Sequence, residues 1–163
     1  MGRKPCIVFK KIGGIGLVSS YNDFYEGKTF EHVLTKTITQ SENHSFCLAT
    51  MNNHRLHLDH EYASSTQFGR PVIVGTLVLS IAVGITVDDI SSGCLANLGY
   101  DEVLHHNPVF PGDTIRCNTI VLNCRKSLSK EKRGIVSVKT KVLNQKDELV
   151  LSFKRSMIFE VEL

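Results

Sequence analysis

The sequence predicts an α+β fold in which an antiparallel sheet wraps around one long, buried helix. A segment at about residues 76–90 carries apolar side chains around most of its circumference, which indicates a helix buried on all sides. The last third of the chain alternates apolar and polar residues instead, as half-buried antiparallel strands do. One buried helix and a run of strands together form a domain of two packed layers.

Two short helices are expected before the buried one. Thr39-Gln40-Ser41-Glu42 is a capping box, in which hydroxyl and carboxylate each accept a backbone N–H, and it predicts a helix over 40–49. Residues 51–59 are polar and rich in histidine, and we expect a loop there. Asp59 is a good N-cap for a second short helix over 60–68.

The buried helix follows Gly75 and ends near two acidic residues. Asp88 and Asp89 lie at the end where the helix dipole disfavours carboxylates, so we expect that end to be exposed or frayed.

Three strands are expected in the last third. Pro111-Gly112-Asp113 forms a turn into a strand over 114–124. The alternating segments 136–142 and 149–153 form two more strands, joined by a turn at 144–147.

The composition fits one ordinary domain. The chain has 163 residues, of which 42% are hydrophobic and 21% are charged, enough for a packed core. We expect a loosely ordered leader over 1–20 and one domain over 21–163. The five cysteines are odd in number and widely spaced, as expected of free thiols in a reducing compartment.

Charge and hydropathy exclude several partners. A net charge of +3 falls short of the basic stripe of a nucleic-acid-binding protein. No charge-free segment reaches the roughly 20 residues of a membrane helix, and the N-terminus lacks a secretory signal pattern. We therefore expect a cytoplasmic protein that binds neither nucleic acid nor membrane.

A metal site is not expected. Four histidines lie close together in the sequence, but no cysteine or carboxylate pattern accompanies them to complete a ligand set: His44, His54, His57 and His60.

Several segments resemble a known family. The first block comprises His57-Leu58-Asp59, Tyr62-Ala63, Phe68-Gly69, Pro71-Val72-Ile73 and Gly75, and the second block is 107–114. In their order and spacing these blocks resemble the MaoC-like dehydratases, a hot-dog-fold family that includes (R)-specific enoyl-CoA hydratases. Further segments resemble the mesaconyl-CoA hydratase (β-methylmalyl-CoA dehydratase) subgroup: Tyr25-Glu26-Gly27, Thr37-Ile38-Thr39, 97–103 and 142–145.

The resemblance implies a fold and a reaction. The fold would be a single hot-dog domain that pairs into a homodimer or a higher oligomer. The reaction would be that of a lyase, a hydratase or dehydratase that reversibly adds water to a 2-enoyl-CoA thioester. The acyl chain could be branched or dicarboxylic, as in mesaconyl-CoA. No cofactor is implied, since coenzyme A enters only as part of the acyl-CoA substrate.

The resemblance also implies a catalytic site. His57 corresponds to the family histidine, and an imidazole can take a proton from water and return it to carbon. Asn52 stands at the position of the family aspartate and can only orient water or the imidazole. Either His57 is the sole base, or a second carboxylate contributes, for which Asp59 and Glu42 are the nearest candidates.

A helix-opening amide and several basic residues complete the implied site. The backbone amides at Gly75 and Thr76 would bind the thioester oxygen at the helix N-terminus. His54 and Arg55 are candidate substrate-binding residues, and Arg55 could pair with an acyl carboxylate. The basic loop 125–133 is either a solvated hairpin or a contact for coenzyme A phosphates.

Two other functions remain open at this point. Asn52 favours a non-catalytic subunit that binds acyl-CoA, because the carboxylate of the family is missing there. A hot-dog thioesterase is the other alternative, although the block from Asn52 to Gly75 resembles hydratases more closely.

Overall fold

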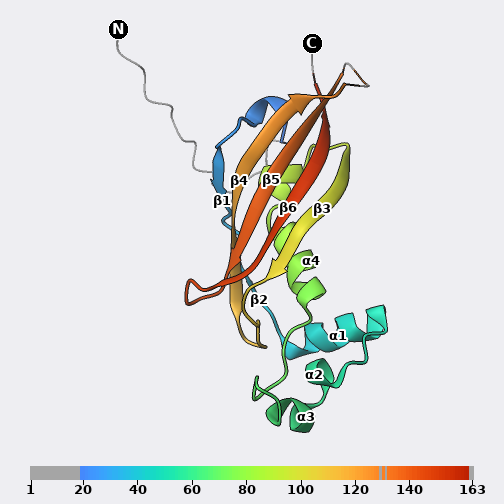
Figure 1. The fold of residues 1–163 in the computed structure, drawn as a ribbon, viewed down its shortest axis with the longest axis vertical. Coiled ribbons are helices and arrows are strands. Elements are labelled where there is room, and N and C mark those ends of the chain that lie inside the picture. The colour runs from blue at the N-terminus through green and yellow to red at the C-terminus, as the bar shows by residue number, and fades with distance from the viewer. Residues whose placement is uncertain (1–18, 129, 131, 162–163) are drawn as a thin grey trace.

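The fold is an antiparallel sheet packed on one central helix (Figure 1). The computed structural model describes residues 19–128, 130 and 132–161. The expected leader at 1–20 therefore falls almost wholly outside the described residues. The two-layer α+β arrangement predicted from the sequence is confirmed.

The main sheet has the strand order β1-β4-β5-β6-β3, and the short strand β2 pairs with β4. Its strands are β1 (Thr29–Glu31), β2 (Lys36–Thr37), β3 (Ala96–His105), β4 (Thr114–Lys126), β5 (Arg133–Leu143) and β6 (Leu149–Glu160). The last three are the strands predicted from alternation, each somewhat longer than expected, and inward residues such as Val136, Val138 and Phe153 are fully buried.

The edge strand β3 was not predicted. Its pairing with β6 is interrupted twice, between Asn97 and Gly99 and between Asp101 and Leu104. Such bulges reset which residues point to each face, so the sequence of β3 shows no regular alternation. The final residue of β3, His105, pairs with Leu151 of β6.

The helices lie below and beside the sheet in Figure 1. They are α1 (Gln40–Thr50), α2 (Arg55–Leu58), α3 (His60–Ser64) and α4 (Gly75–Ile85), preceded by a 3-10 turn at Tyr21–Asp23 and followed by a π-helical turn at Val87–Ser91. The polar loop expected at 51–59 thus contains the single helical turn α2. Helix α3 is shorter than the predicted 60–68.

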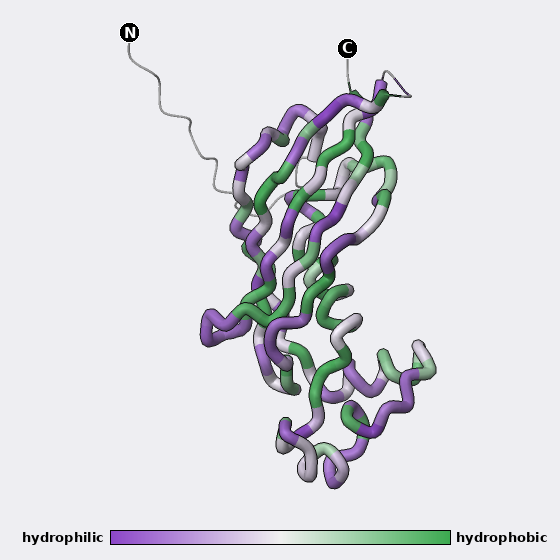
Figure 2. The backbone as a smooth tube through the Cα atoms, viewed as in Figure 1, coloured by the Kyte–Doolittle hydropathy of each residue, from purple (hydrophilic) through white to green (hydrophobic). Residues whose placement is uncertain are grey.

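Helix α4 is the predicted central helix, but it differs from the prediction in two ways. The α-helix ends at Ile85 rather than near residue 90, and it is not buried on every side. Leu77, Val78 and Ala82 face the core, whereas Thr76, Ser80 and Gly84 are exposed on the opposite face. Figure 2 shows hydrophobic residues along α4 and a hydrophilic turn between β5 and β6.

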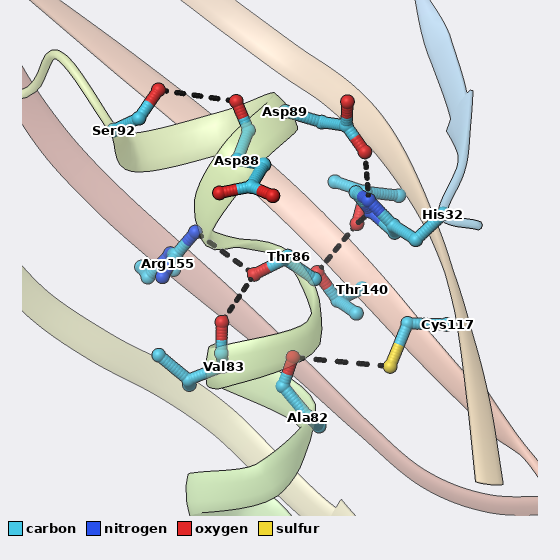
Figure 3. Close-up of polar contacts among 11 residues, drawn as sticks. His32, Ala82, Val83, Thr86, Asp88, Asp89, Ser92, Cys117, Thr140 and Arg155 are labelled. Carbon is cyan, nitrogen blue, oxygen red and sulfur yellow. Dashed lines mark hydrogen bonds and ion pairs between the residues drawn. The ribbon is translucent and has the colours of Figure 1, made fainter. Parts of the chain in front are cut away.

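A buried polar network holds the C-terminal end of α4 against the sheet (Figure 3). The side chain of His32 is fully buried, and its Nδ1 lies 2.9 Å from Asp89 Oδ2 while Nε2 lies 2.8 Å from Thr119 Oγ1. Since a carboxylate only accepts, Nδ1 donates to Asp89. Burial lowers the pKa of His32, so the ring is neutral near pH 7 and Nε2 accepts from the threonine. Fraying at Asp89 is therefore wrong, whereas Asp88 is exposed, as the alternative expectation had it.

A second buried contact joins α4 to β6. Arg155 is 2% exposed and donates through Nη2 to Thr86 Oγ1 at 3.2 Å. Thr86 in turn donates to the carbonyl of Val83 at 2.8 Å. Both contacts fall where the α-helix gives way to the π-helical turn, so they tie this turn to the sheet (Figure 3).

The four described cysteines carry free thiols, as predicted: Cys47, Cys94, Cys117 and Cys124. Burial raises the pKa of Cys117 to about 12, so this thiol stays protonated next to the Ala82 carbonyl. Within the described residues, no helix has the length and apolarity required to cross a bilayer.

The capping box at the start of α1 is confirmed. The Thr39 hydroxyl accepts from the Glu42 amide at 3.2 Å, and Glu42 Oε2 accepts from the Thr39 amide at 2.8 Å. Lys36 forms an ion pair with the same carboxylate, and together these contacts lower the pKa of Glu42 to about 2.

We expect the Glu42 carboxylate to stabilise the fold in a pH-dependent way. Its pKa is below the ordinary value, so its contribution is complete above about pH 4.5 and is lost as the pH falls toward 2. Urea unfolding of Glu42→Gln and of the unmodified chain at several pH values measures the effect. The difference in stability should shrink across this range, and a constant difference would contradict the prediction.

Candidate functional site

A cavity of about 560 Å³ opens at the N-terminal end of α4. Of the predicted site residues, the structure brings four to its wall: Asn52, His57, Gly75 and Thr76. The end of β3 and the segment after it contribute further polar side chains, namely His105, His106 and Asn107. The rest of the lining is apolar and comes mainly from residues 72–74, Pro108, Val109 and Val150.

His57 is held in one orientation by the backbone. It lies on the short helix α2 (Arg55–Leu58), which is capped by His54 at its start and by Asp59 at its end. Its Nδ1 lies 2.8 Å from the carbonyl oxygen of Val72. A carbonyl oxygen only accepts, so Nδ1 carries the proton and Nε2 retains a lone pair. The half-buried ring therefore presents a basic nitrogen to the cavity.

The side chain of Asn43 fastens this histidine segment to the start of α4. Asn43 is fully buried on α1. Its Oδ1 accepts from the Val74 amide at 2.9 Å. Its Nδ2 donates to the carbonyls of His57 at 3.2 Å and Val72 at 3.3 Å. The Asn43 side chain thus bonds the His57 carbonyl and two residues of the segment that leads into α4, Val72 and Val74.

The first turn of α4 presents uncapped amides to the cavity. The N-cap position is Val74, which has no side-chain oxygen to accept from the helix. The amide of Leu77 bonds back to Val74 at 3.0 Å. Among the described residues, the amides of Gly75 and Thr76 have no acceptor. Free N–H groups and the helix dipole together favour a negatively polarised oxygen at this point.

Gly75 also permits a close approach by His105. A Cβ atom at position 75 would lie 2.5 Å from His105 Cε1, 2.9 Å from Nε2 and 3.0 Å from Nδ1. These are the three nearest atoms, so the end of the imidazole that carries both nitrogens packs over the start of the helix. Any larger residue at position 75 would displace this ring.

Arg55 and His54, the candidate substrate-binding residues, lie outside the lining of this cavity. Arg55 donates to Asp59 Oδ2 at 2.7 Å, and its guanidinium lies 4.6 Å from the centroid of the Tyr62 ring. His54 accepts from the Leu56 amide at 3.1 Å through Nδ1 and so caps α2. Both side chains are used to build the turn that carries His57.

Neither candidate for a second carboxylate lines the cavity. Asp59 caps α3 by accepting from the Tyr62 amide at 2.9 Å, as predicted for an N-cap, and this bond lowers the pKa of Asp59. Glu42 is occupied by Thr39 and Lys36. Within the described residues, no group of three or more His, Cys, Asp or Glu side chains is arranged to hold a metal ion.

The basic loop is remote from the cavity of its own chain. It lies at the tip of the β4–β5 hairpin, at the opposite end of the sheet from α1, α2 and α3 (Figure 1). Positions 129 and 131 fall outside the described residues. The described part of the loop contributes nothing to the lining.

Sequence reasoning missed Asn43, His105 and His106. Asn43 stands inside the predicted helix 40–49, where an amide side chain has low helix propensity. That unfavourable choice at a buried position is a signal that could have been used. The histidines immediately precede the family-like block that starts at Asn107, but only the β3–β6 pairing places them beside α4.

We expect Asn43→Leu to destabilise the fold. The change leaves the buried Val74 amide without a partner, at about 1–3 kcal/mol. The carbonyls of His57 and Val72 each lose one of two bonds, since Gln40 and the His57 ring still donate to them. The free energy of unfolding should fall by about 1–3 kcal/mol, measured by urea denaturation. Asn53→Leu, at an exposed position in the next segment, is the matched control. Equal effects of the two changes would show that the Asn43 bonds contribute little.

Known proteins match most of this chain. The sequence model described as the MaoC like domain matches residues 23–144. The chain is 33% identical over 135 residues to the mesaconyl-CoA hydratase of Cereibacter sphaeroides, covering 83% of this chain and 39% of that protein. It is also 33% identical over 135 residues to the beta-methylmalyl-CoA dehydratase of Chloroflexus aurantiacus, covering 83% and 38%. The chain thus spans about two fifths of the length of these curated relatives.

Solved structures share the fold. The monoamine oxidase regulatory protein from Archaeoglobus fulgidus superposes with a TM-score of 0.81 at 33% identity, over 89% of this chain and 96% of that one. A Mycobacterium tuberculosis protein with a double hot-dog fold superposes with a TM-score of 0.80 at 23% identity. That match covers 88% of this chain and 44% of the other. The hot-dog fold predicted from the sequence is confirmed.

Proposed function

Because the chain belongs to the MaoC-like hydratase and dehydratase family, we propose that it reversibly adds water to the double bond of a 2-enoyl-CoA thioester. One observation carries the proposal: a basic imidazole nitrogen and an uncapped helix start lie on the wall of one cavity. Water activation and stabilisation of a thioester oxygen are the two requirements of this reaction.

The proposed reaction uses His57 for both proton transfers. Nε2 of His57 takes a proton from water as the water oxygen bonds to C3 of the enoyl chain. The electron pair of the C2–C3 double bond moves toward the thioester oxygen and forms an enolate. When the carbonyl re-forms, C2 takes the proton back from Nε2, so the net change is addition of one water molecule. Positioned acid–base catalysis of this kind contributes about 10²- to 10⁴-fold.

The amide of Gly75 would bind the enolate oxygen, with help from the adjacent amide of Thr76. Both belong to the first turn of an 11-residue helix, where dipole and free N–H groups favour negative charge. Asn52 is half-buried on the wall beside His57. Its carboxamide would orient the water rather than accept its proton. All the groups required belong to the chain, so we propose that coenzyme A is needed only as part of the substrate.

The acyl chain is proposed to be branched or dicarboxylic, as in mesaconyl-CoA. This finer assignment rests on the names of two relatives that are each 33% identical to the chain. A non-catalytic subunit that binds acyl-CoA is the second candidate, and Asn52 favours it because no described carboxylate lines the cavity. Hydration assays with crotonyl-CoA and mesaconyl-CoA separate the two, since a binding subunit would retain affinity without turnover.

We expect His57→Gln to lower kcat for hydration by about 10³-fold, because glutamine cannot carry the proton. Loss of the ultraviolet absorbance of the enoyl thioester measures the rate. His60→Gln, which changes an exposed histidine on α3 outside the cavity, should leave kcat unchanged. Full activity in the His57 variant would disprove the mechanism.

We also propose that the domain pairs with a second copy of itself through β3. This edge strand exposes apolar residues, with Leu98 53%, Tyr100 41% and Leu104 51% exposed. The exposed face of α4, which includes Ser80 and Gly84, would belong to the same interface. The double hot-dog relative combines two such units.

If the pairing is correct, a charge on this edge should weaken it. We expect Leu98→Lys to shift the chain from dimer toward monomer in sedimentation velocity. Leu128→Lys, which changes a fully exposed leucine on the distant hairpin, should not alter the mass. A monomeric unmodified chain would refute the proposal.

A further inference from the structure

We propose that His105 is a second catalytic donor, which gives an N–H to the thioester carbonyl oxygen alongside the backbone amide of Gly75. This inference rests on the proposed hydration of an enoyl thioester. It assigns a role to a cavity side chain that the mechanism above leaves unused.

The geometry places the nitrogen-bearing end of the ring at the helix start. The three His105 atoms nearest to position 75 are Cε1, Nε2 and Nδ1, at 2.5, 2.9 and 3.0 Å from where a Cβ would be. The ring therefore occupies the space that a side chain at position 75 would take, beside the first free amide of α4. An oxygen bound by that amide would meet an imidazole N–H beside it.

The other polar side chains from this part of the wall already have partners. His106 Nε2 is bonded to Ser152 Oγ at 2.8 Å, and Asn107 Nδ2 donates to the Leu149 carbonyl at 2.8 Å. Nδ1 of His57 is used by Val72. In the part of the chain that the structure describes, the ring of His105 has no hydrogen-bond partner, so its N–H is available to a ligand.

The chemistry of the cavity calls for such a donor. The enolate carries its negative charge on the thioester oxygen, and a lining without Lys or Arg offers that oxygen only N–H and O–H groups. A neutral imidazole always carries one N–H, and an imidazolium carries two. An N–H donor beside the oxygen on which charge develops stabilises the transition state more than the bound substrate.

The direct test compares His105→Phe with His105→Gln. Removal of one oxyanion donor lowers kcat by about 10²- to 10³-fold, so we expect a loss of this size in the Phe variant with less than about threefold change in KM. Glutamine retains an N–H donor and should recover part of the rate. His60→Phe, outside the cavity, should retain full activity.

A spectroscopic readout separates donation from a merely structural role. The carbonyl stretch of ¹³C-labelled butyryl-CoA, which has no double bond to hydrate, is measured by isotope-edited infrared spectroscopy in each complex. A donor polarises the carbonyl and lowers the frequency. We expect the shift seen with the unmodified chain to diminish in His105→Phe and to persist in His57→Gln.

A double-mutant cycle tests the contact with position 75. Alanine is a better helix former than glycine, so Gly75→Ala should fold, but its Cβ displaces the imidazole. We expect Gly75→Ala to lower kcat in the presence of His105 and to have little further effect in His105→Ala. Additive losses would show that the two positions act separately.

The outcomes distinguish the two proposals. An unmodified chain that neither binds nor hydrates an acyl-CoA would refute the proposed function. An active chain in which His105→Phe changes neither kcat nor the carbonyl frequency would refute the role of His105 alone. A loss confined to mesaconyl-CoA, with crotonyl-CoA unaffected, would also refute it, since the ring would then recognise the second carboxylate.

Discussion

The hydrogen bonds of the buried Asn43 amide are the constraint on which the cavity depends. They join three backbone groups from two segments, the turn that carries His57 and the approach to α4. His57 adds its own bond to the same approach through Nδ1. The separation between the imidazole and the helix start is therefore set by a short, closed set of hydrogen bonds. A flexible histidine loop could not hold that separation.

The central helix is positioned by directional contacts at both ends. Its apolar face packs on the sheet, but hydrophobic contact has no preferred direction and tolerates sliding and rotation. Asn43 holds the N-terminal approach, while the buried contacts from His32 to Asp89 and from Arg155 to Thr86 hold the C-terminal end. The free amides of the first turn of α4 line the cavity. The polar contacts at the C-terminal end of α4 therefore also help to fix the direction in which these amides point.

Among the described residues, the cavity lining offers N–H donors and imidazole rings, and no carboxylate. Both acidic side chains that lie nearby in sequence are committed to local structure, Asp59 at the start of α3 and Glu42 at the start of α1. A site of this composition suits chemistry in which negative charge develops on the ligand. In the proposed reaction, His57 transfers the proton. The Gly75 amide and His105 stabilise the thioester oxygen.

The sequence by itself determined the features that arise from neighbours along the chain. The capping box of Thr39 and Glu42, the N-cap at Asp59, the alternation in β4 to β6 and the apolar run of α4 depend on local geometry and periodicity. Only the tertiary structure decided what arises between distant segments. The β3–β6 register puts His105 against Gly75, the Asn43 side chain joins His57 to Val74, and α4 keeps one face uncovered. The bulges in β3 interrupt the alternation of apolar and polar residues that would have predicted this strand. Contacts between residues far apart in the chain produce no regular residue pattern in the sequence, so they could not be predicted from it.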